Sequence, residues 1–219
     1  MRNNQRTALT VTIQIAPLTE LERDALTELS NMAMARAATS LRQMIKNEVR
    51  LSVPNVEILV PAAAVKLLKK TGELRLIAVR QDFSGPFSGR TILIFPEARS
   101  LELVRTIVGE SMSLQDIIDL EDEALAETGN ILINSWVATL ANLLKQQLKM
   151  SLPSVVRCEP ANLFEEIGGQ KLLILFVHIS FEISKQEIQG YVALMMDIPS
   201  IEELRLLIAE YVTSIARNS

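Results

Sequence analysis

Two short groups of carboxylate and amide side chains share one spacing. Glu28 and Asn31 are three residues apart in "ELSN", and Glu127 and Asn130 repeat that spacing in "ETGN", 99 residues later. An asparagine amide has one acceptor and two donors on a short stem, so it can orient a water molecule or a phosphoryl oxygen, but it cannot act as a base. With no histidine or metal-ligand cluster beside it, each pair has the chemistry of a half-site that a partner completes.

Each pair lies in a stretch with the pattern of a long amphipathic helix. A helix turns about 100° per residue, so Glu28 lies about 60° and Asp24 about 20° from Asn31, and the three share a face. The same arithmetic groups the polar residues of the second helix, which are Glu123, Glu127, Asn130 and Asn134. The apolar stripes fall on the opposite sides of both helices. We therefore expect both polar groups to face the solvent.

Composition excludes several classes of function. The chain has 219 residues, a net charge of -4 and scattered basic residues, which gives no electrostatic footprint for nucleic acid. No apolar run approaches the ~20 residues of a membrane-spanning helix, and the N-terminal region does not have the pattern of a signal peptide. One cysteine, Cys158, cannot form an internal disulfide. We expect a cytoplasmic protein without a membrane segment.

Metal binding is also poorly supported, because zinc sites draw on several Cys and His residues and this chain has one of each. The histidine, His178, lies in "KLLILFVHISFEI", which has the pattern of a strand. We interpret it as a structural residue at a sheet face. The sequence thus predicts no metal site.

The order of predicted elements is the same in the two halves of the chain. After a short β-like stretch at 7–15, a helix is expected from Thr19, where Glu22 completes a capping box, to about Val49. A strand at 52–60, a short helix at 61–70, a hairpin at 73–96 and a helix at 97–110 follow. A second long helix at about 114–149 begins the same series again, with a strand after Pro153, a hairpin and a terminal helix.

These correspondences indicate an internal duplication. Both hairpins place a glycine (Gly89, Gly190) before an apolar strand and a serine (Ser100, Ser200) before a helix. We predict an α+β fold with a pseudo-two-fold internal repeat, in which two long motif-bearing helices pack on a mainly antiparallel β-sheet. Residues 1–219 would form one domain made of two repeats, at about 18–110 and 114–216, that share a sheet to bury their apolar faces.

A proline follows each asparagine by 23 residues, and the resulting pattern resembles a known signature. Asp24, Glu28, Asn31 and Pro54 fit Asp/Ser-x3-Glu-x2-Asn-x22-Pro, which is typical of the CheC, CheX and FliY phosphatases of chemotaxis. The second copy consists of Glu123, Glu127, Asn130 and Pro153. It fits three of the four positions and has Glu123 where Asp or Ser is expected. Two motifs in one chain are most similar to the CheC type.

The resemblance implies an enzyme, a hydrolase that dephosphorylates the phosphoaspartyl receiver of a CheY-like response regulator in chemotaxis or related two-component signalling. Asn31 and Asn130 would orient the attacking water, and Glu28 and Glu127 would contact a receiver lysine. The chain would need no cofactor of its own, because the receiver would supply Mg²⁺. The water-positioning role resembles that of a glutamine in GTPases.

Other positions would adjoin the partner. Asp24, Glu123 and Asn134 share the motif faces, and Met34 lies about 60° from Asn31, so all four are predicted to border the docking surface. Met34 belongs to the stretch 32–36, "MAMAR", where the family often has Ile-Gly-x-Gly-His. The alternative function is a non-catalytic adaptor that binds a receiver or a CheD-like deamidase, or a flagellar-switch-like scaffold. A small-molecule hydrolase is disfavoured because the sequence has neither a nucleophile–base pair nor a glycine-rich phosphate loop.

Overall fold

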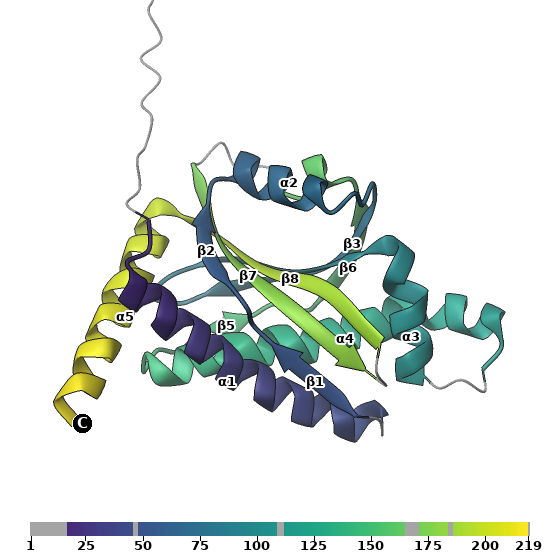
Figure 1. The fold of residues 1–219 in the computed structure, drawn as a ribbon, viewed down its shortest axis with the longest axis horizontal. Helices are drawn as coiled ribbons and strands as arrows, with labels where there is room; N and C mark the ends of the chain where they lie inside the picture. The colour runs from purple at the N-terminus through teal and green to yellow at the C-terminus, as the bar shows by residue number, and fades with distance from the viewer. Residues whose placement is uncertain (1–16, 46–47, 109–111, 165–170, 184–185, 219) are drawn as a thin grey trace, which may run out of the picture.

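The structure is a computed structural model that describes residues 17–45, 48–108, 112–164, 171–183 and 186–218. Its described residues form a curved antiparallel sheet with four helices packed on or beside one face and a short helix across the other (Figure 1). The α+β class and the packing of two long helices on an antiparallel sheet are therefore confirmed. In these residues, no helix is both long enough and apolar enough to cross a membrane.

The elements follow the predicted order closely. The helices are α1 (Glu20–Ile45), α2 (Pro61–Lys70), α3 (Ser100–Val108), α4 (Leu114–Leu143) and α5 (Ile198–Asn218), with short 3-10 turns η1 (Glu97–Arg99) and η2 (Pro160–Asn162). The strands are β1 (Val49–Ser52), β2 (Val56–Leu59), β3 (Leu76–Ser84), β4 (Gly89–Pro96), β5 (Lys149–Met150), β6 (Ser154–Cys158), β7 (Leu172–Ile183) and β8 (Gln186–Asp197).

The strand order interleaves the two halves of the chain. Across the sheet it is β1-β7-β8-β4-β3-β5, with β2 also on β7 and β6 also on β3. Each half therefore supplies its two short strands to the long hairpin of the other half. If every strand is exchanged for its counterpart in the other half, the same order is read in reverse. Such an order is what two repeats related by a two-fold axis between β4 and β8 would give.

Two glycines permit the close approach of β4 and β8 at this central seam. A Cβ atom added to Gly190 would lie 2.9 Å from a ring carbon of Phe95, and one added to Gly89 would lie 2.2 Å from the carbonyl oxygen of Met195. Real side chains essentially never tolerate such distances. The two glycines that the hairpins share are thus required by strand packing, at matching ends of the seam.

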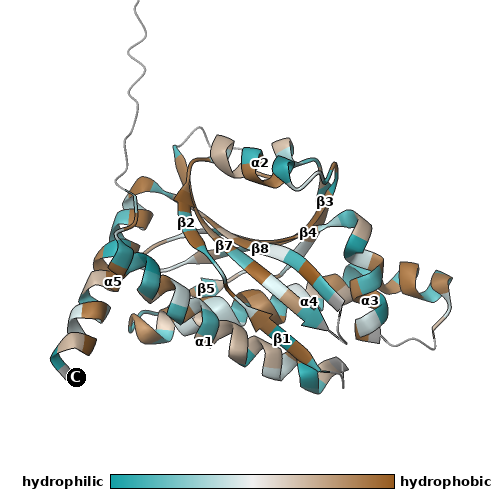
Figure 2. Ribbon diagram, viewed as in Figure 1, coloured by the Kyte–Doolittle hydropathy of each residue, from teal (hydrophilic) through white to brown (hydrophobic). Residues whose placement is uncertain are grey.

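Helices α1 and α4 lie side by side against one face of the sheet (Figure 1). Their contact includes a buried hydrogen bond from the indole Nε1 of Trp136 to Ser30 Oγ, at 3.0 Å. Apolar residues gather on the strands and on the inner sides of these helices, while the outer sides are polar (Figure 2). On the opposite sheet face, α2 and the residues around η2 cover a second, smaller apolar cluster.

Four expectations about secondary structure are corrected or lie outside the described residues. The first long helix ends by 45 rather than 49, because Val49 begins a strand that pairs with β7. The second ends at Leu143 rather than near 149, because Lys145 adopts a left-handed backbone with φ of 54°. The strand expected at 52–60 is interrupted around Pro54, which separates β1 from β2. The stretch at 7–15 lies outside the described residues.

Candidate functional site

The motif residues occupy matching positions on α1 and α4 but differ in their exposure. The carboxylates Glu28 and Glu127 are exposed, and the side chains show no hydrogen bond or ion pair within the described residues. Asp24 and Glu123 are likewise exposed, one helical turn closer to the N-terminus. In contrast to these carboxylates, the motif amides are partly buried, and these are Asn31, Asn130 and Asn134. The expectation that the whole polar group is displayed in the solvent is therefore wrong for the asparagines.

The width of the buried arc explains this difference. Each motif helix packs against both the sheet and the other motif helix, so about half of its circumference is covered. Asn31 lies at the edge of that arc, next to the buried Ala38 about 20° away. Glu28 lies about 60° further into the solvent. The hydrophobic pattern alone indicated a narrower stripe.

Met34 does not border a docking face. Its side chain is 0% exposed, and so is that of its counterpart Ile133 on α4. Both lie on the side of the asparagine that faces the protein interior, about 60° from it in the direction opposite to the glutamate. The prediction of a partner-binding role for Met34 is corrected: it is a core residue between the elements that position the motif.

Asn31 binds the backbone of the segment that leads to Pro54. Its Oδ1 accepts a hydrogen bond from the backbone N–H of Val53 at 2.9 Å, and its Nδ2 lies 3.5 Å from the Val53 carbonyl oxygen. Val53 is buried and directly precedes Pro54, which cannot donate a backbone hydrogen bond. The spacing of 23 residues between asparagine and proline therefore has a structural cause, because the asparagine anchors the bend between β1 and β2.

Asn130 is held by two side chains instead. Its Oδ1 accepts hydrogen bonds from Asn134 Nδ2 at 2.6 Å and from Gln81 Nε2 at 3.2 Å. Gln81 Nε2 also donates to the carbonyl oxygen of Ser151 at 2.9 Å. The second motif is thus tied to the corresponding bend through Gln81, on β3, and without a direct bond from Asn130.

Backbone groups fix the orientation of both amides. The N–H of Val53 can only donate, so Asn31 must present its oxygen there. The carbonyl of Ser151 can only accept, so Gln81 must present its nitrogen, and Asn130 must then present its oxygen to Gln81. Within the described residues, nothing accepts a hydrogen bond from Asn130 Nδ2. Its N–H donors are therefore available to an external group.

An ion pair anchors the first motif helix near its beginning. Thr19 and Glu22 form the predicted capping box, and Arg205 on α5 binds both carboxylate oxygens of Glu22, at 2.9 and 3.0 Å. Burial alone would raise the pKa of Glu22, but the hydrogen bonds from Arg205 and Thr19 outweigh it and lower the pKa below its ordinary value. The pair joins α1 to the terminal helix.

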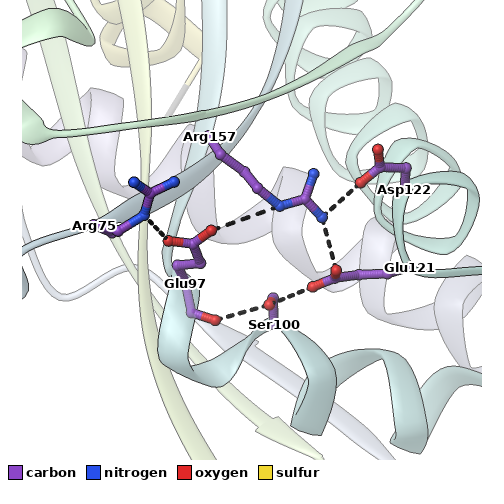
Figure 3. Close-up of polar contacts among 6 residues, drawn as sticks. All are labelled: Arg75, Glu97, Ser100, Glu121, Asp122 and Arg157. Carbon is purple, nitrogen blue, oxygen red and sulfur yellow. Dashed lines mark hydrogen bonds and ion pairs between the residues drawn. The ribbon is translucent and has the colours of Figure 1, made fainter. Parts of the chain in front are cut away.

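The second motif helix is anchored at the same register by a larger network (Figure 3). Glu121, the counterpart of Glu22, accepts hydrogen bonds from Arg157 on β6 and from Ser100 at the start of α3. Arg157 also pairs with Asp122 at 2.7 Å and lies 3.6 Å from Glu97. The pKa of Arg157 is raised, mainly by its hydrogen bond with Asp122. Both helices are thus fixed two turns before the motif glutamate.

Sequence reasoning missed Gln81 and Val53 as partners of the motif asparagines. Gln81 left a signal, because it occupies a core-facing position in the alternation of Ile77, Val79 and Phe83 on β3. Val53 left none, since a backbone group carries no sequence identity. His178 lies in β7 as predicted, with Nε2 3.1 Å from Glu57 Oε1 and its ring against Phe176. Within the described residues, no group of three or more His, Cys, Asp or Glu is placed to hold a metal ion.

Residues 21–58, which contain Asp24, Glu28, Asn31 and Pro54, match the CheC-like family. Over 195 residues the chain is 23% identical to the CheY-P phosphatase CheC of Bacillus subtilis, covering 84% of this chain and 92% of that protein. The chain is therefore similar to CheC over most of the length of both proteins. The resemblance drawn from the motifs is therefore confirmed for this family.

The chain is also similar to FliY proteins. It is 20% identical over 179 residues to the flagellar motor switch phosphatase FliY of Bacillus subtilis, which covers 80% of the chain but only 46% of that protein. Its structure matches the crystal structure of Thermotoga maritima FliY with a TM-score of 0.66, at 18% identity, over 90% of this chain and 98% of that one. The fold is thus shared with FliY, and the chain spans about half the length of the Bacillus protein.

Proposed function

We propose that the chain is a phosphatase that hydrolyses the phosphoaspartate of a CheY-like receiver domain. The observation that carries this proposal is the paired display of an exposed glutamate and an oriented asparagine on two neighbouring helices. Support also comes from the similarity to a CheY-P phosphatase over most of both chains. The pathway would be chemotaxis or a related two-component system.

In the proposed reaction a water oxygen attacks phosphorus in line with the bond to the receiver aspartate. That bond breaks, the aspartate leaves as a carboxylate, and both water hydrogens leave with the phosphate. Asn31 or Asn130 would hold the water by a hydrogen bond, and Glu28 or Glu127 would pair with a lysine of the receiver. A dissociative phosphoryl transfer needs this kind of positioning more than it needs a strong base.

The receiver would supply the Mg²⁺. Among the described residues, no group of three or more His, Cys, Asp or Glu side chains is placed to hold a metal ion. The chain would then provide only the groups that the receiver lacks, which agrees with the incomplete chemistry of each motif.

The test is phosphate release from a phosphorylated CheY-type receiver, with the wild type and with Asn31→Ala/Asn130→Ala. We expect the double variant to lose a factor on the order of 10² to 10³ in rate, as for other single preorganised hydrogen-bonding groups. Gln43→Ala/Asn142→Ala is a matched control, which changes two exposed residues more than three turns further along the same helices, about 120° around from the asparagines, and should keep most of the activity. Full activity in the asparagine double variant would refute the catalytic proposal.

A second candidate is a non-catalytic adaptor for receivers, a CheD-like deamidase or the flagellar switch. The hydrogen bond from Val53 to Asn31 favours it, because that bond gives the motif asparagine a purely structural use. An adaptor would bind the phosphorylated receiver without speeding its dephosphorylation. Binding that survives the loss of both asparagines, together with no phosphate release by the wild type, would support this alternative.

A further inference from the structure

We propose that Gln81 and Asn134 are positioning residues of the second site. They hold the carbonyl oxygen of Asn130 inside the fold, so that Asn130 acts on the attacking water or the phosphoryl group through its N–H donors. This inference rests on the proposed phosphatase function, and it assigns the reacting edge of the amide. It also makes the second site chemically distinct from the first.

The first step of the argument is the use of hydrogen-bonding capacity. A carbonyl oxygen has two lone pairs, and those of Asn130 Oδ1 are engaged by Asn134 at 2.6 Å and Gln81 at 3.2 Å. That oxygen is therefore occupied, whereas both hydrogens of Nδ2 lack an acceptor within the described residues. A water that accepts one of these hydrogens keeps a second lone pair for attack on phosphorus.

The second step is that Gln81 is a poor choice for stability alone. Its side chain is 2% exposed, and its Oε1 is buried without a hydrogen-bond partner in the described structure. Burying an unpaired polar atom destabilises a fold. Thr91, directly opposite on β4, has a buried hydroxyl that also lacks a partner, so the neighbouring strand does not satisfy the glutamine.

The third step compares Gln81 with its counterpart. Val79 pairs with Val155 on β6 just as Val177 pairs with Val56 on β2, so two residues further along Gln81 corresponds to Ile179. Ile179 is fully buried and apolar, which shows that this position of the sheet accepts an apolar side chain. The polar group at Gln81 is therefore tied to Asn130 and the bend at Ser151.

Asn134 gives the same contrast on the helix. Its counterpart on α1 is Ala35, which has no side-chain donor. Asn31 thus lacks both side-chain partners and relies on Val53, whose carbonyl also engages one Nδ2 hydrogen over a long 3.5 Å. The two side-chain donors that hold Asn130 Oδ1 therefore have no equivalent in the first site.

The test uses the Asn31→Ala background, in which only the second site can act. Gln81→Met keeps the volume and removes the donor, and Asn134→Ala removes the other donor at a partly exposed helix position where alanine is favoured. Ile179→Met is the matched control at the corresponding position of the first half. Phosphate release from a phosphorylated CheY-type receiver gives kcat and KM, and NMR relaxation of the Asn130 side-chain NH₂ group reports its order.

We expect Gln81→Met to lower kcat about tenfold with an unchanged KM, the effect of misplacing one hydrogen-bonding group. Asn134→Ala should lower kcat in the same way, and each change should reduce the order parameter of the Asn130 NH₂ group. Ile179→Met should change neither quantity. Gln81→Met removes an unpaired buried oxygen together with the hydrogen bond to the Ser151 carbonyl, and these two changes have opposite effects on stability. Urea unfolding should therefore show a folded variant with a midpoint close to that of the background, so the loss of rate would not reflect a loss of fold.

Two results would count against different claims. If the Asn31→Ala background is active but both positioning variants keep full kcat and an ordered Asn130 amide, the inference is wrong and the phosphatase function stands. If the wild type is inactive with the receiver, the proposed function fails. The NMR measurement then still decides whether Gln81 and Asn134 hold Asn130, and an unchanged order parameter would overturn that as well.

Discussion

The bends that follow the two motif helices differ in how they use the motif asparagines. In the first half Val53 is bound by Asn31 and is 3% exposed, whereas its counterpart Leu152 in the second half is 88% exposed. The side-chain amide of Asn31 binds the backbone of the bend directly. In the second half Gln81, and not Asn130, binds the backbone of the bend. One half therefore favours stability at this point, and the other leaves its asparagine donors open.

The two motif helices also differ in their contact with the sheet, and a substitution at this contact is expected to have the largest effect on stability. Gly129 on α4 is the counterpart of Ser30, and a Cβ atom added to Gly129 would lie 2.6 Å from the side chain of the buried Val79. Val79 Cβ is next to the backbone and cannot swing aside. We expect Gly129→Ala to lower the free energy of unfolding by about 2–3 kcal/mol, despite its gain in helix propensity.

Urea unfolding monitored by circular dichroism would measure this change. Val79→Ala in the same chain should restore part of the loss, because it removes Cγ1 and Cγ2, which would lie 2.6 and 2.7 Å from the added Cβ, while Val79 Cβ stays in place. Ser30→Ala is the matched control on α1, where only the hydrogen bond from Trp136 is lost, at about 1 kcal/mol. Equal effects of Gly129→Ala and Ser30→Ala would show that the two helices do not differ in their fit to the sheet.

Much of this architecture followed from local pattern in the sequence. Thr19 and Glu22 specify the start of α1, Pro61 and Gly72 bracket α2, and the shared position of Gly89 and Gly190 before an apolar strand is visible in the sequence. These signals depend on neighbours in the chain. The motif pairs were found in the same way, because repetition at 99 residues is visible without a structure.

The errors came from contacts between distant segments. Met34 is buried because α1 is covered by α4 as well as by the sheet, and a single helical pattern does not record a second neighbour. The end of α1 before Val49 depends on strand pairing with β7, more than 120 residues away. The hydrogen bonds from Val53 to Asn31 and from Gln81 to Asn130 were missed for the same reason, because they join residues that only the folded chain brings together.

The variants Asn31→Ala and Asn130→Ala should differ in their free energy of unfolding. We expect the asparagine with the larger structural role to have the smaller role in catalysis. Asn31→Ala leaves the buried N–H of Val53 without its acceptor, which should cost about 1–2 kcal/mol of unfolding free energy. Asn130→Ala should cost less, because Gln81 keeps its bond to Ser151 and the partly exposed Asn134 can turn to water. Parallel urea titrations of the single variants would compare them, and a larger loss for Asn130→Ala would reverse the assignment of roles.

The anchors at the beginning of the motif helices give the smallest expected difference. The pKa of Glu22 is lowered in the folded protein, so its contribution is fully present above the pKa of the unfolded chain and is lost as pH falls through the folded value. We expect Glu22→Gln to cost about 1 kcal/mol at neutral pH, and this deficit should shrink below the ordinary pKa of about 4.5.

Glu121→Gln is the matched change in the second half, where Arg157 keeps Asp122 as a partner and Ser100 keeps the carbonyl of Glu97. Its effect on unfolding at neutral pH should therefore be smaller than that of Glu22→Gln, which removes a carboxylate that binds Arg205 through both of its oxygens. Thermal unfolding of both variants and the wild type between pH 3 and 7 would measure this. A deficit for Glu22→Gln that stays constant over the whole range would mean that the carboxylate charge contributes nothing to anchoring α1, and that shape alone holds the first motif helix against α5.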